Sequence, residues 1–162
     1  MAKVLVIDDE PDARVLLDIH LRHRGYDVIL AGDGWRGLQL YHQEHPDVIL
    51  LDLNMPELNG VTVLKQIRAV DLKQPVIILT ADSNPETEQQ VRAIGVNDFV
   101  LKSSSMHLLE AALAHLFMGR KPKFGQPRNI LTSSSTVSGA FPSARMLTST
   151  YARRPALVAE WP

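Results

Sequence analysis

The stretch Asp47-Val48-Ile49-Leu50-Leu51-Asp52 places four consecutive apolar residues between two carboxylates. A short, unbroken apolar run of this kind is typical of a strand that is buried on both faces of a parallel sheet. Similar runs occur elsewhere in the chain at residues 4–7, 28–30, 76–79 and 99–101. Together the five runs predict a five-stranded parallel sheet.

Longer amphipathic segments separate these runs and predict five helices, at residues 11–24, 34–45, 61–70, 85–94 and 105–118. Pro11 and Pro85 stand in first turns, where a missing N–H costs nothing. Gly25, Gly95 and Gly119 follow helix ends, where a left-handed residue is common. The alternation predicts an α/β fold, a doubly wound (βα)5 sheet with helices on both faces and right-handed crossovers.

Side-chain spacing also predicts which faces and caps the helices use. The first helix is expected to bury four residues that fall near one face, namely Val15, Leu16, Ile19 and His23. Trp35 heads the apolar face of the second helix and is expected to pack there. Ser83 and Glu86 have the spacing of a capping box, and one serine of residues 103–105 is expected to cap the last helix.

Charge and composition divide the chain in two. Residues 1–118 contain 17 acidic and ten basic residues, whereas residues 119–162 contain seven basic residues and one acidic residue. The second segment is rich in Ser, Thr and Pro, so we expect a disordered basic tail after a single ordered domain. Cysteine is absent, which excludes disulfides. No long apolar stretch indicates a signal peptide or a membrane span, so we expect a cytoplasmic protein without membrane attachment.

Polar side chains follow four of the predicted strands. Asp8 and Asp9 follow the first, Asp52 the third, Thr80 the fourth and Lys102 the fifth. Ligands of an open parallel sheet bind at the carboxyl ends of its strands, so these residues are expected to meet. Each has a plain alternative, such as an acid that stabilises a helix N-terminus. Clustered carboxylates, however, repel one another unless a cation shares them, and their oxygens suit Mg²⁺.

Four segments resemble, in order and at compatible spacings, the motifs of bacterial response-regulator receiver domains. They are Val4-Leu5-Val6-Ile7-Asp8-Asp9-Glu10-Pro11, Asp47-Val48-Ile49-Leu50-Leu51-Asp52-Leu53-Asn54-Met55-Pro56 followed by Gly60, Pro75-Val76-Ile77-Ile78-Leu79-Thr80-Ala81, and Gly95-Val96-Asn97-Asp98-Phe99-Val100-Leu101-Lys102. The resemblance covers about residues 2–118 and implies a flavodoxin-like fold with strand order 2-1-3-4-5. Since no effector domain is recognisable after residue 118, we expect a stand-alone, chemotaxis-type receiver that acts on a separate output protein.

The resemblance implies the chemistry of the site as well. Asp52 would accept a phosphoryl group from a histidine kinase or a phosphotransfer protein. Lys102 would pair with Asp52 at rest and with the phosphoryl group afterwards. The implied ligands of Mg²⁺, or of Mn²⁺ as the alternative ion, are Asp9 and Asp52 directly, the backbone carbonyl of Asn54, and Asp8 through a water. Phosphoryl transfer needs mostly positioning and charge neutralisation, which these groups supply.

A switch is implied by the same comparison. Thr80, beside Ala81 on the catalytic edge, would swing to bond the phosphoryl oxygen, and Phe99 would follow it inward. Phosphorylation adds up to nearly two negative charges, and the groups that answer lie at the ends of the last two strands. The helix, strand and helix within residues 85–118 are therefore expected to bind the output protein, with homodimerisation through the same face left open.

Two features depart from the motifs or tune them. Ser103 stands where the family usually has a proline in a cis bond, and a cis bond before serine costs about 3–4 kcal/mol, so we expect a trans bond after Lys102. Asn54 and Asp82 would flank the approach of a hydrolytic water, which favours a short-lived phosphoaspartate. A solvated turn residue is an equally good interpretation of Asp82.

Three other interpretations compete with the receiver. A phosphatase of the haloacid dehalogenase type needs a second acid where Asn54 stands, and Asn54 cannot act as a general acid. A flavodoxin-like binding module needs a phosphate loop after the first strand, where acids stand instead. The basic tail lacks aromatic interleaving and a helix-turn-helix pattern, so no specific nucleic-acid binding is predicted, and at most a non-specific, salt-sensitive contact with nucleic acid or an anionic membrane. A linker to a further domain and a segment without a function are equally good interpretations of the tail. The six histidines form no evident metal framework.

Overall fold

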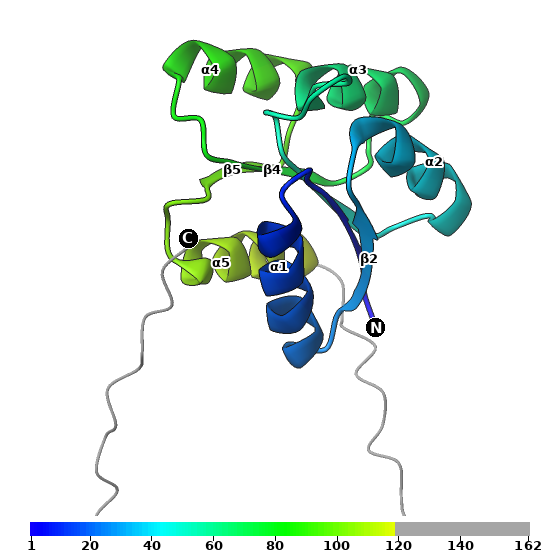
Figure 1. Ribbon diagram of the computed structural model, residues 1–162, viewed down its shortest axis with the longest axis vertical. Helices are drawn as coiled ribbons and strands as arrows, with labels where there is room; N and C mark the ends of the chain where they lie inside the picture. Colours follow the sequence, from blue (N-terminus) through cyan, green and yellow to red (C-terminus); the bar gives the residue numbers. More distant parts are fainter. Residues whose placement is uncertain (119–162) are drawn as a thin grey trace, which may run out of the picture.

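The computed structural model describes residues 1–118, which form five strands and five helices in strict alternation (Figure 1). The strands are β1 (Lys3–Ile7), β2 (Asp27–Ala31), β3 (Val48–Leu51), β4 (Val76–Thr80) and β5 (Asp98–Leu101). The helices are α1 (Pro11–His23), α2 (Gly34–Glu44), α3 (Gly60–Val70), α4 (Pro85–Ile94) and α5 (Met106–Phe117). All strand pairs are parallel, in the order β2-β1-β3-β4-β5, which confirms the predicted fold. The predicted disordered tail, residues 119–162, lies outside the described residues.

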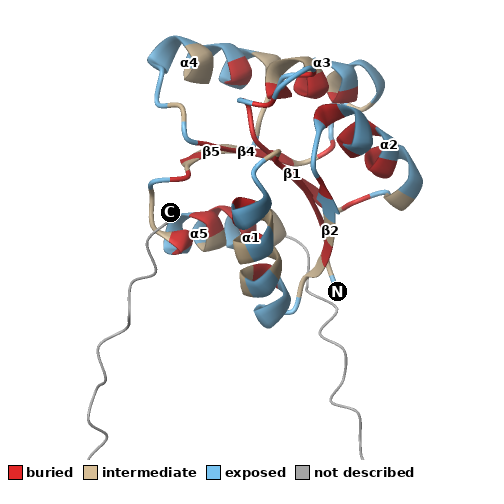
Figure 2. Ribbon diagram, viewed as in Figure 1, coloured by how far each residue is buried: buried red, intermediate tan, exposed pale blue. Residues whose placement is uncertain are grey.

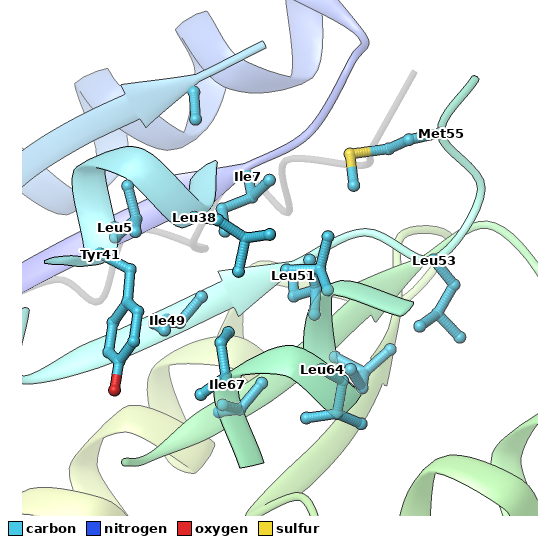
Figure 3. Close-up of a cluster of buried hydrophobic side chains, with 14 of the residues drawn as sticks. Leu5, Ile7, Leu38, Tyr41, Ile49, Leu51, Leu53, Met55, Leu64 and Ile67 are labelled. Carbon is cyan, nitrogen blue, oxygen red and sulfur yellow. The ribbon is translucent and has the colours of Figure 1, made fainter. Parts of the chain in front are cut away.

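The sheet separates two apolar cores, one on each face (Figure 2). Alternate side chains of a central strand enter opposite cores, so β1 gives Leu5 and Ile7 to one core and Val4 and Val6 to the other. Helices α2, α3 and α4 close the first core, which Figure 3 shows in detail, and α1 and α5 close the second. Because both faces are covered, the central strands have no polar face, which explains their unbroken apolar runs.

The predicted buried face of α1 is wrong. The helix buries a different stripe, made of Ala13, Leu17 and Leu21. Val15 and Ile19 are 56% and 63% exposed, His23 is exposed, and Leu16 is only partly buried. Both stripes have four-residue spacing, so helical periodicity alone does not distinguish them. The small alanine allows the helix to approach the sheet, and the β-branched residues face outward.

Two local predictions at helix starts are also corrected. Trp35 is 59% exposed and does not head a packing face, since α2 buries apolar residues further along the helix. The cap of α4 is Asn84, whose Oδ1 accepts the backbone N–H of Glu86 at 2.9 Å. Ser83 precedes that cap and is not the capping residue. An asparagine serves the same purpose because its side-chain oxygen reaches a free N–H of the first turn.

Glycine is required where the backbone is crowded or left-handed. At Gly60 an added Cβ would overlap the carbonyl oxygen of Asp52 and lie 2.7 Å from the Cα of Leu53. The N–H of Gly60 donates to the carbonyl of Leu53 at 3.0 Å, so α3 begins directly against the chain that carries Asp52. Gly25 and Gly95 have φ of 86° and 109°, as predicted for helix ends.

Among residues 1–118, none of the helices is both long and apolar enough to cross a bilayer.

Candidate functional site

Backbone hydrogen bonds continue past the strand ends and fix the residues of the carboxyl edge. The N–H of Asp8 donates to Ala31 at 3.1 Å, that of Asp52 to Ile7 at 2.9 Å, and that of Lys102 to Thr80 at 2.8 Å, each at the backbone carbonyl. The side chains that follow β1, β3 and β5 are therefore placed by the ladder of the sheet itself. Their positions are therefore set by regular sheet structure, which favours a well-defined site.

Three carboxylates converge at this edge. One oxygen from each of Asp8, Asp9 and Asp52 lies within 4.8 Å of the others. Asp8 and Asp52 are 2% and 5% exposed, and Asp9 is partly buried. The backbone N–H of Asn54 donates to Asp52 Oδ1 at 3.3 Å, which places the Asn54 backbone beside the same group. Closely spaced hard oxygen donors in a half-buried setting fit a small divalent cation such as Mg²⁺.

Lys102 compensates part of this negative charge. Its Nζ lies 2.7 Å from Asp8 Oδ2, 3.1 Å from Asp52 Oδ2 and 3.4 Å from Glu10 Oε2. Burial alone would lower the pKa of Lys102, but its hydrogen bond to Asp8 and the charges of Asp52 and Asp8 outweigh burial and raise that pKa. The lysine is therefore held as a cation. The predicted contact with Asp52 is present, while the shorter contact to Asp8 was not predicted.

Asp8 is the carboxylate most affected by its surroundings. Burial raises the pKa of Asp8 and is the largest effect. The hydrogen bonds from Lys102 and from the backbone N–H of Glu10, together with the lysine's charge, lower that pKa by less. The net direction is upward, so one lysine does not fully compensate the group. Additional positive charge at this edge would stabilise the ionised form, in agreement with the fit to a cation.

The predicted switch residues lie on adjacent strands: Thr80 ends β4, while Phe99 lies on β5 in register with Ile78. Thr80 is fully buried, and its Oγ1 accepts the backbone N–H of Asp82 at 3.2 Å. Asp82 in turn accepts the N–H of Asn84 at 2.9 Å, which supports its interpretation as a turn residue that leads into α4. Phe99 is half-buried against the first core, while Ala81 is exposed. Their roles in switching remain predictions.

The loop after Lys102 agrees with expectation. Residues 1–118 contain no cis peptide bond, so the bond to Ser103 is trans. The N–H of Ser104 donates to the carbonyl of Leu101 at 2.9 Å, and Ser105 caps α5 by accepting the N–H of His107 at 3.2 Å. The substitution of serine for proline therefore leaves Lys102 in contact with the acids.

Sequence reasoning assigned no role to two charged residues that contact the site. Glu10 was part of a quoted motif, yet its contact with Lys102 was not predicted. Arg14 donates from its guanidinium to the backbone carbonyl of Asp8 at 2.7 Å and lies against Gly32. It thus bonds the β1–α1 turn and packs beside the loop after β2. Its position one turn into α1, on the side of Glu10, was the only signal in the sequence.

The family model "Response regulator receiver domain" matches residues 4–114. A probable transcriptional regulator, ycf27 of Guillardia theta, is 41% identical over 111 residues, which is 68% of this chain and 43% of that protein. Chemotaxis protein CheY4 of Vibrio cholerae is 31% identical with a TM-score of 0.68, covering 72% of this chain and 98% of that one. Response regulator TrrA of Thermotoga maritima, solved in complex with Mg²⁺-BeF, is 31% identical with a TM-score of 0.66, covering 72% and 99%.

Coverage differs between these two groups of similar proteins. The chain spans 43% of the ycf27 regulator and 43% of the alkaline phosphatase synthesis regulator PhoP of Bacillus subtilis, to which it is 39% identical over 64% of its own length. It spans nearly all of CheY4 and TrrA. The matched part is the same α/β unit in each case, and the family match favours it over the phosphatase and the flavodoxin-like module.

Proposed function

Because this chain belongs to the family of response regulator receiver domains, signalling domains of two-component systems rather than metabolic enzymes, we propose that Asp52 is its phosphoacceptor. The observation that carries the proposal is the position of Asp52 Oδ2, 3.1 Å from Lys102 Nζ and in one group with Asp8 and Asp9. The phosphoryl group would come from a cognate histidine kinase, which a receiver domain implies, or from a phosphotransfer protein. The nature of that donor is part of the proposal.

Transfer of the phosphoryl group requires little covalent chemistry from the protein beyond the attack by Asp52. An oxygen of Asp52 attacks phosphorus in line, the bond from phosphorus to the donor's imidazole nitrogen breaks, and the electron pair leaves with the imidazole. Receiver domains use Mg²⁺, and the ligands proposed for this chain are Asp9, Asp52 and the backbone carbonyl of Asn54, with Asp8 acting through a water. A bound Mg²⁺, or Mn²⁺ as the alternative ion, supplies charge neutralisation at the transferred group. Lys102 then holds the anion from the other side as a point charge.

The proposed output follows from the two strands that end beside Asp52. Thr80 and Lys102 are the groups that can answer the new charge; Ala81 follows Thr80 directly, and Phe99 lies on β5 three residues before Lys102. We therefore assign partner binding, or homodimerisation, to the face of α4, β5 and α5. CheY4, a chemotaxis protein matched over 98% of its length, supports a stand-alone, chemotaxis-type receiver, whereas the longer transcriptional regulators support the same unit within a larger protein.

Intact mass tests the chemistry. The protein is incubated with acetyl phosphate and Mg²⁺, and we expect a gain of one phosphoryl group that is absent in Asp52→Asn and after removal of Mg²⁺ with EDTA. Asp47→Asn is the control, because this acid lies at the opposite end of β3. A phosphoryl group that persists in Asp52→Asn would place the acceptor elsewhere.

Two further measurements test the switch and the lifetime. Beryllofluoride with Mg²⁺ should shift backbone NMR signals mainly in α4, β5 and α5, and changes confined to α1 and α2 would contradict the proposed output face.

With Asn54 and Asp82 beside the site, we expect a phosphoaspartate that decays quickly. A half-life of many hours would oppose that expectation.

A further inference from the structure

Lys102 contacts three carboxylates, and only two of them belong to the group of acids suited to a divalent cation. Asp8 and Asp52, at 2.7 and 3.1 Å from its Nζ, belong to the group of acids suited to a divalent cation. Glu10, at 3.4 Å, does not belong to that group. Among residues 1–118, Glu10 is thus the lysine's one carboxylate partner that a cation bound to the aspartates leaves free.

Glu10 occupies a helix N-cap position without using its side chain as a cap. It is the N-cap of α1, with φ −77° and ψ 112°, a position from which a side chain commonly accepts an N–H of the first turn. Within the described residues its carboxylate makes no such bond and contacts Lys102 instead. Its backbone N–H donates to Asp8 Oδ1 at 2.9 Å, which fixes where the side chain starts. The carboxylate is therefore available to the lysine rather than committed to the helix.

The ammonium of Lys102 and a divalent cation would share two carboxylates, because Asp8 and Asp52 contact the lysine and also belong to the group of acids suited to a cation. Both are attracted to Asp8 and Asp52, and two positive charges drawn to the same carboxylates repel each other. A cation can bind at full strength only if the ammonium gives up part of its contact with the aspartates. Glu10 offers the ammonium another anion on the solvent side, since its side chain is 53% exposed while those of Asp8 and Asp52 are 2% and 5% exposed.

We propose that Glu10 is a positioning residue that receives the ammonium of Lys102 when Mg²⁺ occupies the aspartates. The lysine then stays at the mouth of the site, beside Asp52, where a phosphoryl donor arrives. This inference rests on the proposed function, because it concerns the same cation and the same nucleophile. It predicts that Glu10 acts on Mg²⁺ binding through Lys102 and not as a ligand.

Asp12 is the matched control. It lies two residues further along and is exposed, and its carboxylate forms no hydrogen bond or ion pair within residues 1–118. Asp12→Asn and Glu10→Gln each remove one negative charge near the edge, so both weaken Mg²⁺ binding slightly through the local field. Only Glu10→Gln also removes the alternative partner of the lysine.

Calorimetric titration of the full chain with MgCl₂ measures the difference. Glu10→Gln should bind Mg²⁺ about threefold more weakly than Asp12→Asn, the size expected for a partly exposed ion pair. When Lys102 is also replaced by Met, the Glu10→Gln and Asp12→Asn proteins should bind Mg²⁺ equally well, because there is no ammonium left to relocate. Equal affinities for the two single variants would overturn the proposal, and so would an excess that persists without the lysine, since Glu10 would then act as a ligand.

NMR of the lysine itself gives a readout in proteins that keep the lysine at position 102. In protein labelled at the lysine ε-carbons, the Lys102 signal, assigned by its loss in Lys102→Arg, should move on Mg²⁺ addition to one position in wild type and Asp12→Asn and to a different position in Glu10→Gln. The same final position in all three would overturn the proposal. Phosphorylation of the wild type by acetyl phosphate is measured separately, so its absence would defeat the proposed function while leaving the Glu10 results to be judged independently.

Discussion

Helices α3 and α4 follow the neighbouring strands β3 and β4, yet they are held to the sheet very differently. Of its 11 residues, α3 buries Gly60, Val63, Leu64 and Ile67, whereas within the described chain α4 buries Val91 alone of its ten. A segment with few buried contacts opens at a lower free-energy cost than the molecule as a whole. The helix that follows Asp52 is thus anchored, and the helix that follows Thr80 is held lightly. We expect the nucleophile to stay fixed while α4 responds.

Substitution of one glycine at each of the two helices should produce the largest difference in the free energy of unfolding. Gly60→Ala should lower the free energy of unfolding by about 3 kcal/mol or more, because the new methyl group overlaps the backbone of Asp52 and Leu53. Gly95→Ala should cost about 1–2 kcal/mol, because its φ of 109° is unfavourable while an added Cβ meets only the Arg68 side chain, at 3.6 Å. Urea unfolding measures both. Equal costs would remove the contrast between the helices.

Two fully buried valines allow a comparison at constant chemistry. Val63 and Val91 are both 0% exposed. Val63→Ala should cost about 2–3 kcal/mol of global stability. Val91→Ala should cost about 1 kcal/mol, because a helix with one anchor can undock instead of keeping a cavity. Hydrogen exchange should increase throughout α4 in Val91→Ala, and exchange confined to global unfolding would show that α4 is no looser than α3.

The sequence predicted strands better than helix faces, and the reason is physical. A strand covered on both sides must be apolar at every position, so Val48–Leu51 could be identified directly. In α1, by contrast, Val15 with Ile19 and Leu17 with Leu21 satisfy the same spacing, and only packing against the sheet chooses between them. The light anchoring of α4 was likewise not predictable from its length and caps.

The site was predictable in its members but not in its contacts. The rule that parallel strands end at one edge assembled Asp8, Asp9, Asp52, Thr80 and Lys102, because that rule depends on backbone topology alone. The 2.7 Å contact from Lys102 to Asp8 and the contact to Glu10 depend on side-chain conformation and burial, which a sequence does not state. Ser105 was predicted as a cap only as one of three serines.

The asparagine caps of the two helices offer a smaller test. Asn59 accepts the N–H and the hydroxyl of Thr62 at 2.9 and 3.0 Å, and Asn84 accepts the N–H of Glu86 at 2.9 Å. Loss of a cap costs about 0.5–2 kcal/mol. We expect Asn59→Ala to cost about 1 kcal/mol globally, and Asn84→Ala to cost less globally while loosening α4 in hydrogen exchange. The reverse order would mean that α4 is the better anchored helix.

Arg68 joins α3 to the end of α4, so its substitution tests the anchoring of α4 with the smallest expected change in stability. Its Nε donates to the carbonyl of Gly95, at the end of α4, at 2.8 Å, and its guanidinium also reaches the carbonyl of Asp71 at 3.1 Å. Arg68→Met should cost about 0.5–1 kcal/mol, since the Gly95 carbonyl loses its charged donor, and it should speed exchange selectively in α4. Arg92→Met is the control, because it removes only an exposed bridge to Glu88 within α4, worth about 0.3–0.5 kcal/mol. If Arg92→Met loosens α4 more than Arg68→Met does, then α4 is stabilised by its own surface contacts, and light anchoring to α3 and the sheet is not what would let it move.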